Sequence, residues 1–195
     1  GYGKRILPEK MMILSVRAAS IGYALPGTVI AVGVIIPFAW FDRKIDSLMS
    51  SYFGISSGLI LSGTIFAIMF AYVVRFLAVS LQTVESGLEK IKPSMDDAAR
   101  SLGYRPREAL MKVHIPLLKS SSLTALMIVF VDVMKELPAT LILRPFDFNT
   151  LAVRTFELAS DERLADSSTS ALAIVLAGLL PVIYLSQTIS KTRLE

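Results

Sequence analysis

Three long stretches of the chain contain no charged residue, and they dominate its pattern of apolar and polar positions. They cover 18–41, 47–74 and 167–190. Each is longer than the roughly 20 residues that an α-helix needs to cross about 30 Å of hydrocarbon. We therefore predict membrane-spanning helices at about 16–40, 56–79 and 169–190.

A fourth apolar segment, at 120–131, is too short to cross a membrane alone but continues through three ionisable residues to Leu143. We predict a fourth span at about 118–143. Ionisable side chains in a span are expected to face protein or water, and they often mark a substrate pathway. The candidate residues for a translocation path or outer gate are Asp132, Lys135, Glu136 and Pro138.

These four residues also have a plainer interpretation. Asp132 and Lys135 are three positions apart, which places them on one helix face where they can form an ion pair. Such a pair could simply hold helices together, or the residues could extend to the outer surface. Pro138 is predicted to break or kink the helix.

Composition excludes several classes of protein. Of the 195 residues, 53% are hydrophobic and only 18% are charged, whereas soluble domains carry about 25% charged residues. A chain of this length is too apolar for a compact soluble enzyme. It has no cysteine and a single histidine, which argues against disulfide scaffolds, metal centres and histidine-dependent hydrolases. We expect an all-α integral membrane protein with no catalytic residue and no metal site.

The basic residues alternate between connections. Thirteen of the 20 Lys and Arg residues lie in 1–17, 80–119 and the C-terminal tail. Because cytoplasmic connections are enriched in Lys and Arg, we expect both termini and the 80–119 loop to be cytoplasmic. We expect no nucleic-acid binding, because this loop lies between two spans and has only Tyr104 for base stacking.

The segment 94–116 is punctuated like two short helices. Ser94 is a candidate N-cap for a helix over 95–102, and Gly103 stands where a left-handed C-cap is needed. Pro106 suits the first turn of a second helix, which Pro116 would end. A rigid exposed element of this kind is suited to docking a partner protein.

This segment resembles the "EAA" loop of ABC importer permeases, whose pattern is E-A-A, three residues, G, nine residues, then I-x-L-P. The matching residues are Asp97-Ala98-Ala99, Gly103, Val113, and Ile115-Pro116. In that family the loop is the coupling helix that docks on the cytoplasmic ATPase. The resemblance implies that role for Asp97, Ala98, Ala99, Arg100, Gly103, Ile115 and Pro116, whereas His114 is expected to be a packing residue.

The resemblance covers most of the chain. The segments 22–33, 95–103, 132–151 and 156–164 are similar to the C-terminal half of ferric-iron permeases, which have a MetI-like core. We therefore expect 1–195 to be one permease domain, the C-terminal half of a longer protein. Related permeases for thiamine, 2-aminoethylphosphonate and polyamines are alternatives.

The family also implies partners and a location. They are an ABC ATPase dimer, a periplasmic or extracellular substrate-binding protein, the other permease half, and the bilayer of a bacterial inner membrane. This chain has no G-x-x-x-x-G-K-[S/T] loop, so ATP would be bound by the partner. We expect no cofactor in this chain.

An ion-coupled secondary transporter is the alternative from another class. It would use Asp132 or Glu136 for proton or ion coupling, but it would not explain the structured loop. An intramembrane enzyme is not expected, because the spans contain no paired catalytic groups.

Two further sequence features are weaker signals: a possible helix cap at Asn149 and a pair of glycines at 54 and 58. Asn149 is a candidate cap for a short helix at 150–159 in the outer loop 144–168, where a binding protein would dock. Gly54 and Gly58 form a G-x-x-x-G, a spacing that allows close packing of membrane helices.

Overall fold

The computed structural model describes residues 10–192, and every regular element in this part of the chain is a helix. The helices are α2 (Lys10–Ile21), α3 (Gly27–Phe53), α4 (Ile65–Glu89), α5 (Pro93–Ser101), α6 (Pro106–Ala109), the π-helical turn η1 (Leu110–His114), α7 (Ile115–Met134), α8 (Pro138–Leu143), α9 (Leu151–Ser160) and α10 (Leu164–Thr192). The prediction of an all-α fold is confirmed.

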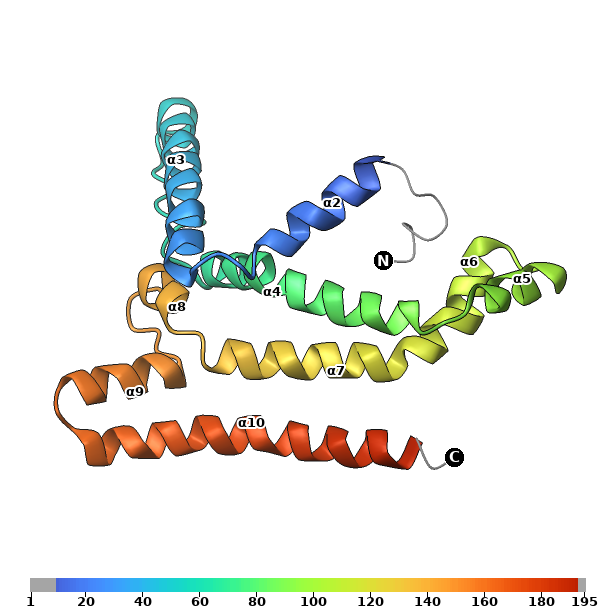
Figure 1. The fold of residues 1–195 in the computed structure, drawn as a ribbon. Helices are drawn as coiled ribbons and strands as arrows, with labels where there is room; N and C mark the ends of the chain where they lie inside the picture. Colours follow the sequence, from blue (N-terminus) through green and yellow to red (C-terminus); the bar gives the residue numbers. More distant parts are fainter. Residues whose placement is uncertain (1–9, 193–195) are drawn as a thin grey trace.

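Three long helices form the body of the molecule. Helix α7 packs between α4 and α10, and the three run side by side in Figure 1. Helices α5 and α6 lie at one end of this layer, together with the C-terminal end of α10, and α8 and α9 lie at the opposite end. Within the described residues, the helices long and apolar enough to cross a membrane are Ile65–Glu89, Pro106–Met134 and Leu164–Tyr184. We expected about four.

The difference arises at the first expected span, 16–40, which is not one helix. Helix α2 ends at Ile21, and α3 begins only at Gly27. Pro26 precedes α3 with an extended ψ of 142°, and proline disfavours helical geometry in the residue before it. Helix α3 then continues past Asp42 to Phe53 and stands steeply to the three-helix layer (Figure 1). The charge-free stretch therefore identified an apolar segment correctly, but the segment is two helices and not the single helix that we predicted.

The second span begins later than predicted, at Ile65 rather than at about 56. The segment before it, 54–64, is not helical. Gly54, Gly58 and Gly63 adopt positive φ values of 65°, 62° and 69°, which glycine tolerates better than other residues. The G-x-x-x-G of Gly54 and Gly58 therefore lies outside any helix, and its interpretation as a helix-packing motif is wrong.

Two carboxylates of α3 hold this segment in place. Asp42 is buried and accepts hydrogen bonds from the backbone N–H groups of Leu61 (2.9 Å) and Ser62 (2.8 Å). Asp46 accepts hydrogen bonds from the Ser56 hydroxyl (2.7 Å) and the Ser57 N–H (2.8 Å). The residues 54–64 consequently fold back along α3.

These contacts lower the pKa of both carboxyl groups. Burial by itself raises the pKa of Asp42, but the hydrogen bonds from 60–62 outweigh burial and place it below its ordinary value of 3.8. The pKa of Asp46 is lowered mainly by the hydrogen bonds from Ser56 and Ser57. Both groups are stabilised in the ionised form.

The third and fourth expected spans fit better. The break predicted at Pro138 is present, because α7 ends at Met134 and α8 begins at Pro138. Helix α10 contains the whole of 169–190. Pro116 does not end the second loop helix as predicted. The residues from Pro106 to Met134 form one continuous helix, and the wider turn η1 just before Pro116 accommodates the missing N–H.

Small residues pack the end of the molecule that contains α8. The main buried cluster joins α3, α4 and α8 through Ile30, Ala31, Val34, Ala67, Ile68, Ala71, Ala139 and Leu143. Alanines allow close approach of helix backbones in membranes. This cluster fixes the position of α8 and of the polar residues next to it.

Candidate functional site

The loop 94–116 is a folded unit. Helix α5 starts at Pro93, with Lys92 as the N-cap residue and no side-chain cap, so the predicted Ser94 cap is wrong. Its C-terminal end is a Schellman motif: the Gly103 N–H donates to Arg100 O (2.9 Å) and the Tyr104 N–H donates to Ala99 O (3.0 Å). Gly103 has a φ of 81°, as predicted from the sequence.

A buried contact joins the two helices of the loop. His114 is completely buried, and its Nε2 lies 2.5 Å from Oδ1 of Asp96. Ala99 and Ala109 are also buried. His114 is therefore a packing residue, as expected, and it ties α5 to η1.

The residues implied in docking are divided between the surface and the interior of the loop. Asp97 and Arg100 have side chains that are 71% and 70% exposed and lie 3.6 Å apart. Ala98, Gly103, Ile115 and Pro116 are also exposed, whereas Ala99 faces inward. The structure adds Leu102, which is 74% exposed beside Gly103. Sequence reasoning missed Leu102, although an apolar residue just before a capping glycine is a visible signal.

Polar residues cluster near the opposite end, around the α7–α8 break. Lys135 Nζ lies 3.0 Å from Asp132 Oδ1, which confirms the predicted ion pair. Asp132 is buried, and Lys135 is largely exposed. The two residues belong to neighbouring turns at the C-terminal end of α7, so this pair is local.

Glu136 has a different partner, Arg75 of α4. The Arg75 Nε lies 3.1 Å from Glu136 Oε2, and its Nη1 donates to the Leu25 carbonyl at 3.1 Å. Glu136 Oε1 accepts from the Ala139 N–H at 3.3 Å. Sequence reasoning missed Arg75, although a single charge directly after 28 charge-free residues is a signal of a buried polar site.

A second polar contact links the same helices. The Thr140 hydroxyl donates to the Glu136 carbonyl (2.7 Å). The Tyr72 hydroxyl, 2.5 Å away, therefore donates to Thr140. Tyr72 is one helical turn from Arg75, so α4 contacts the start of α8 at two successive levels.

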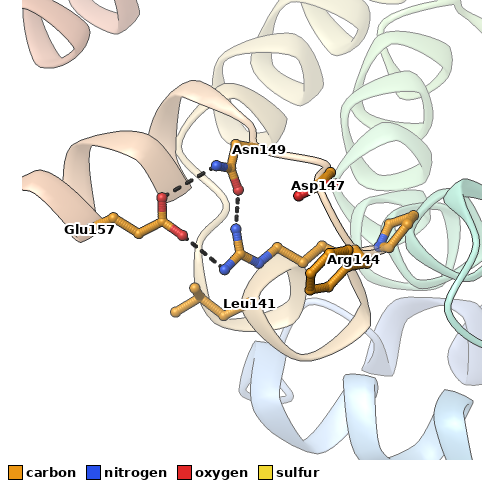
Figure 2. A pocket seen from close by; sticks show the side chains of 7 residues that line it. Leu141, Arg144, Asp147, Asn149 and Glu157 are labelled. Carbon is orange, nitrogen blue, oxygen red and sulfur yellow. Dashed lines mark hydrogen bonds and ion pairs between the residues drawn. The ribbon is translucent and has the colours of Figure 1, made fainter.

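The loop 144–168 contributes to a polar pocket of about 310 Å³, drawn in Figure 2. The Arg144 guanidinium donates to Glu157 Oε1 (2.8 Å) and also to the Asn149 side chain. Asn149 therefore does not cap α9. Thr150 does, accepting from the Val153 N–H at 3.3 Å. Phe146, at the edge of this pocket, is 95% exposed.

The polar clusters do not form a metal-binding arrangement. Between residues 10 and 192, no three His, Asp or Glu side chains lie close enough to hold a metal ion.

Comparisons with known proteins agree with the geometry. Residues 11–195 match the family model of the binding-protein-dependent transport system inner membrane component. The chain is 30% identical over 165 residues to the Fe(3+)-transport system permease protein FbpB 2 of Haemophilus influenzae, covering 85% of this chain and 29% of that protein. It is 27% identical over 157 residues to PhnV of Salmonella typhimurium, provisionally named as a 2-aminoethylphosphonate transport system permease, covering 80% and 53%.

The chain thus spans between about a third and a half of the length of these relatives. The family model, by contrast, covers nearly all of the chain, and it includes both the loop 94–116 and the α7–α8 break. The chain therefore belongs to the family of inner-membrane components of binding-protein-dependent transport systems.

Proposed function

We propose that this chain is the membrane-spanning part of an ATP-driven, binding-protein-dependent importer, with ATP bound and hydrolysed by a separate chain. The observation that carries the proposal is the loop 94–116. It is a rigid, exposed unit that connects α4 directly to α7. A push on this unit displaces two membrane helices together.

The docking surface of the loop is the exposed side of α5 and its C-terminal turn. Asp97, Ala98 and Arg100 would contact the ATPase, and Leu102 would be the apolar anchor. An exposed apolar side chain on a rigid frame is a favourable binding hot spot. Ala99 and Gly103 would act indirectly, through close packing of α5 and the reversal of the chain, while Ile115 and Pro116 would flank the entry to α7.

Ferric iron is the proposed substrate, because the relative with 30% identity is named for Fe(3+) transport. A second candidate is 2-aminoethylphosphonate, which the relative with 27% identity supports. In this class of importer an external binding protein selects the substrate. The outer loop 144–168, with exposed Phe146, is the proposed docking surface for that protein, and the other permease half is a further proposed partner.

The proposed topology places the loop 94–116 and both ends of the chain in the cytoplasm of a bacterial cell. The C-terminal end of α10 and the α5–α6 unit lie at the same end of the layer (Figure 1), which supports this orientation. The basic residues of 80–119 also support it.

An ion-coupled transporter is less well supported. It requires a carboxylate that gains and loses a proton in the membrane, but Asp132 and Glu136 both lie in ion pairs, with Lys135 and Arg75. These contacts favour a structural or gating role for both residues.

The test uses the full-length protein in proteoliposomes, with its ATPase and with ferric-loaded or 2-aminoethylphosphonate-loaded binding protein. We expect the ferric-loaded protein to stimulate ATP hydrolysis, and Gly103→Asp to abolish the stimulation. Gly54→Asp is the matched control, because Gly54 also has a positive φ but lies in the segment after α3. Stimulation only by 2-aminoethylphosphonate would refute iron, and no associated ATPase would refute the importer.

A further inference from the structure

The ion pair between Arg75 and Glu136 lies deep in the molecule. Arg75 is ten residues after the start of α4, or about 15 Å along the helix. Its side chain is 19% exposed, and that of Glu136 is 6% exposed. Charges inside a membrane span are costly and are retained where they have a function.

Both side chains bind backbone groups that a helix break leaves open. Arg75 donates to the carbonyl of Leu25, in the break between α2 and α3. Glu136 accepts from the N–H of Ala139, in the first turn of α8. Without water, open backbone groups in a membrane need protein partners. The same ion pair therefore supplies hydrogen-bond partners to the backbone at the α2–α3 break and at the α7–α8 break.

The first residue of α3 lies close against the ion pair. A Cβ atom on Gly27 would lie 2.5 Å from Glu136 Oε1 and 2.9 Å from Arg75 Nη1. The first residue of α3 is thus in direct contact with both charged groups. The ion pair therefore lies against the start of α3 as well as between α4 and the α7–α8 break.

The two helices that reach this pair are the two that flank the loop 94–116. From Arg75, α4 continues without a break for about 21 Å to Glu89, just before α5. On the other side, the helix from Pro106 runs unbroken to Met134, two residues before Glu136. A displacement of the loop therefore reaches both members of the ion pair through rigid helix.

We propose that Arg75 and Glu136 form a joint that transmits movement of the loop 94–116 to the broken outer segments, α2–α3 and α8. They act as positioning residues for the coupling of ATP hydrolysis to transport. This inference depends on the proposed function, because it assumes that an ATPase moves the loop.

The decisive variant is the double substitution Arg75→Leu with Glu136→Leu. Removing both charges leaves no unpaired buried ion. It also removes the partners of the Leu25 carbonyl and the Ala139 N–H, so the ratio is compared only in protein that assembles. The control is Asp46→Asn with Ser56→Ala, which removes an exposed polar contact with an O–O distance of 2.7 Å outside both proposed docking surfaces. Substrate uptake and ATP hydrolysis are measured in the same proteoliposomes, with assembly checked by thermal unfolding in detergent.

We expect the double leucine variant to assemble and to hydrolyse ATP, but to import about tenfold less substrate for each ATP. The control should import as much substrate for each ATP hydrolysed as the wild-type protein does. An unchanged ratio in an assembled double leucine variant would overturn the proposal, because the pair would then be only structural.

If the double leucine variant fails to assemble, the proposal is tested with Arg75→Lys instead. This variant keeps the positive charge but loses the branched guanidinium group, whose separate nitrogens contact Glu136 and the Leu25 carbonyl. We expect it to assemble with a lowered ratio, and an unchanged ratio would overturn the joint. Absence of substrate-stimulated hydrolysis in the wild-type protein would instead refute the proposed function.

Discussion

His114 Nε2 lies 2.5 Å from Asp96 Oδ1, although the two residues are 18 positions apart. This contact crosses the loop 94–116 and joins α5 to the π-helical turn before α7. A force applied to α5 is therefore passed to α7 through a side-chain contact as well as through the chain. The loop acts as one body because a polar contact, as well as apolar packing, joins its two helices.

Loss of this contact is expected to loosen α5 selectively. Asp96→Ala should lower the free energy of local opening by about 1–3 kcal/mol, since a buried polar group loses a charged partner. Hydrogen exchange of the amides in 93–101 measures that opening. Asp97→Ala is the control, because Asp97 is highly exposed. Equal exchange in the two variants would contradict the role assigned to Asp96.

A side chain at Gly27 should displace the ion pair beside it. Gly27→Ala places a methyl group against Glu136 and Arg75, and overpacking of this kind costs about 1–3 kcal/mol. Gly33 lies in the same helix, and a Cβ atom there would meet nothing within 4 Å, so Gly33→Ala should be neutral or slightly stabilising. Thermal unfolding in detergent compares the two, and a Gly27→Ala protein as stable as wild type would contradict the observed packing.

Acid should release the segment 54–64 from α3. Asp42 has a lowered pKa in the folded protein, so its ionised form contributes stability at neutral pH. That contribution begins to decline near the ordinary value of 3.8 and is lost as the pH falls through the lower folded value. Proteolysis of 54–64 should therefore increase below that range, when it is measured with a protease active at each pH and normalised to cleavage of an unstructured peptide. Asp42→Asn should show the increase already at neutral pH, and a pH-independent cleavage rate would refute this mechanism.

Labelling from outside the cell tests the orientation. The chain contains no cysteine, so single cysteines can be introduced without a background from these 195 residues. Phe146→Cys should react with a membrane-impermeant thiol reagent on intact cells, whereas Leu102→Cys should react only after the membrane is opened. The reverse pattern would invert the proposed topology.

The sequence predicted those features that depend on composition and on single strong signals. Long charge-free stretches located α4 and α10 approximately, and Gly103 was correctly placed in a left-handed turn. Helix continuity was predicted less well. The break at 22–26 was hidden by an apolar stretch, even though Gly22, Pro26 and Gly27 lie in or beside it, and Pro116 was accommodated by a π-helical turn instead of ending a helix.

The candidate site was predicted only in part, for a similar reason. Asp132 and Lys135 are three residues apart, so helical spacing suggested their ion pair. Arg75 and Glu136 are 61 positions apart, and only the packing of α4 against α8 brings them together. Asp42 and Asp46 were likewise invisible as anchors, because their partners lie in a segment that was expected to be largely helical.

Cross-linking at the tip of the loop 94–116 tests its coupling role without relying on transport rates. Leu102→Cys in the full-length protein is treated with a thiol–amine cross-linker in the presence of its ATPase, and Phe146→Cys serves as the exposed control at the other end of the molecule. We predict that Leu102→Cys forms a covalent adduct with the ATPase and that Phe146→Cys does not. An adduct at Phe146 alone, or none at either position in a transport-competent complex, would contradict the assignment of this loop as the ATPase-coupling element.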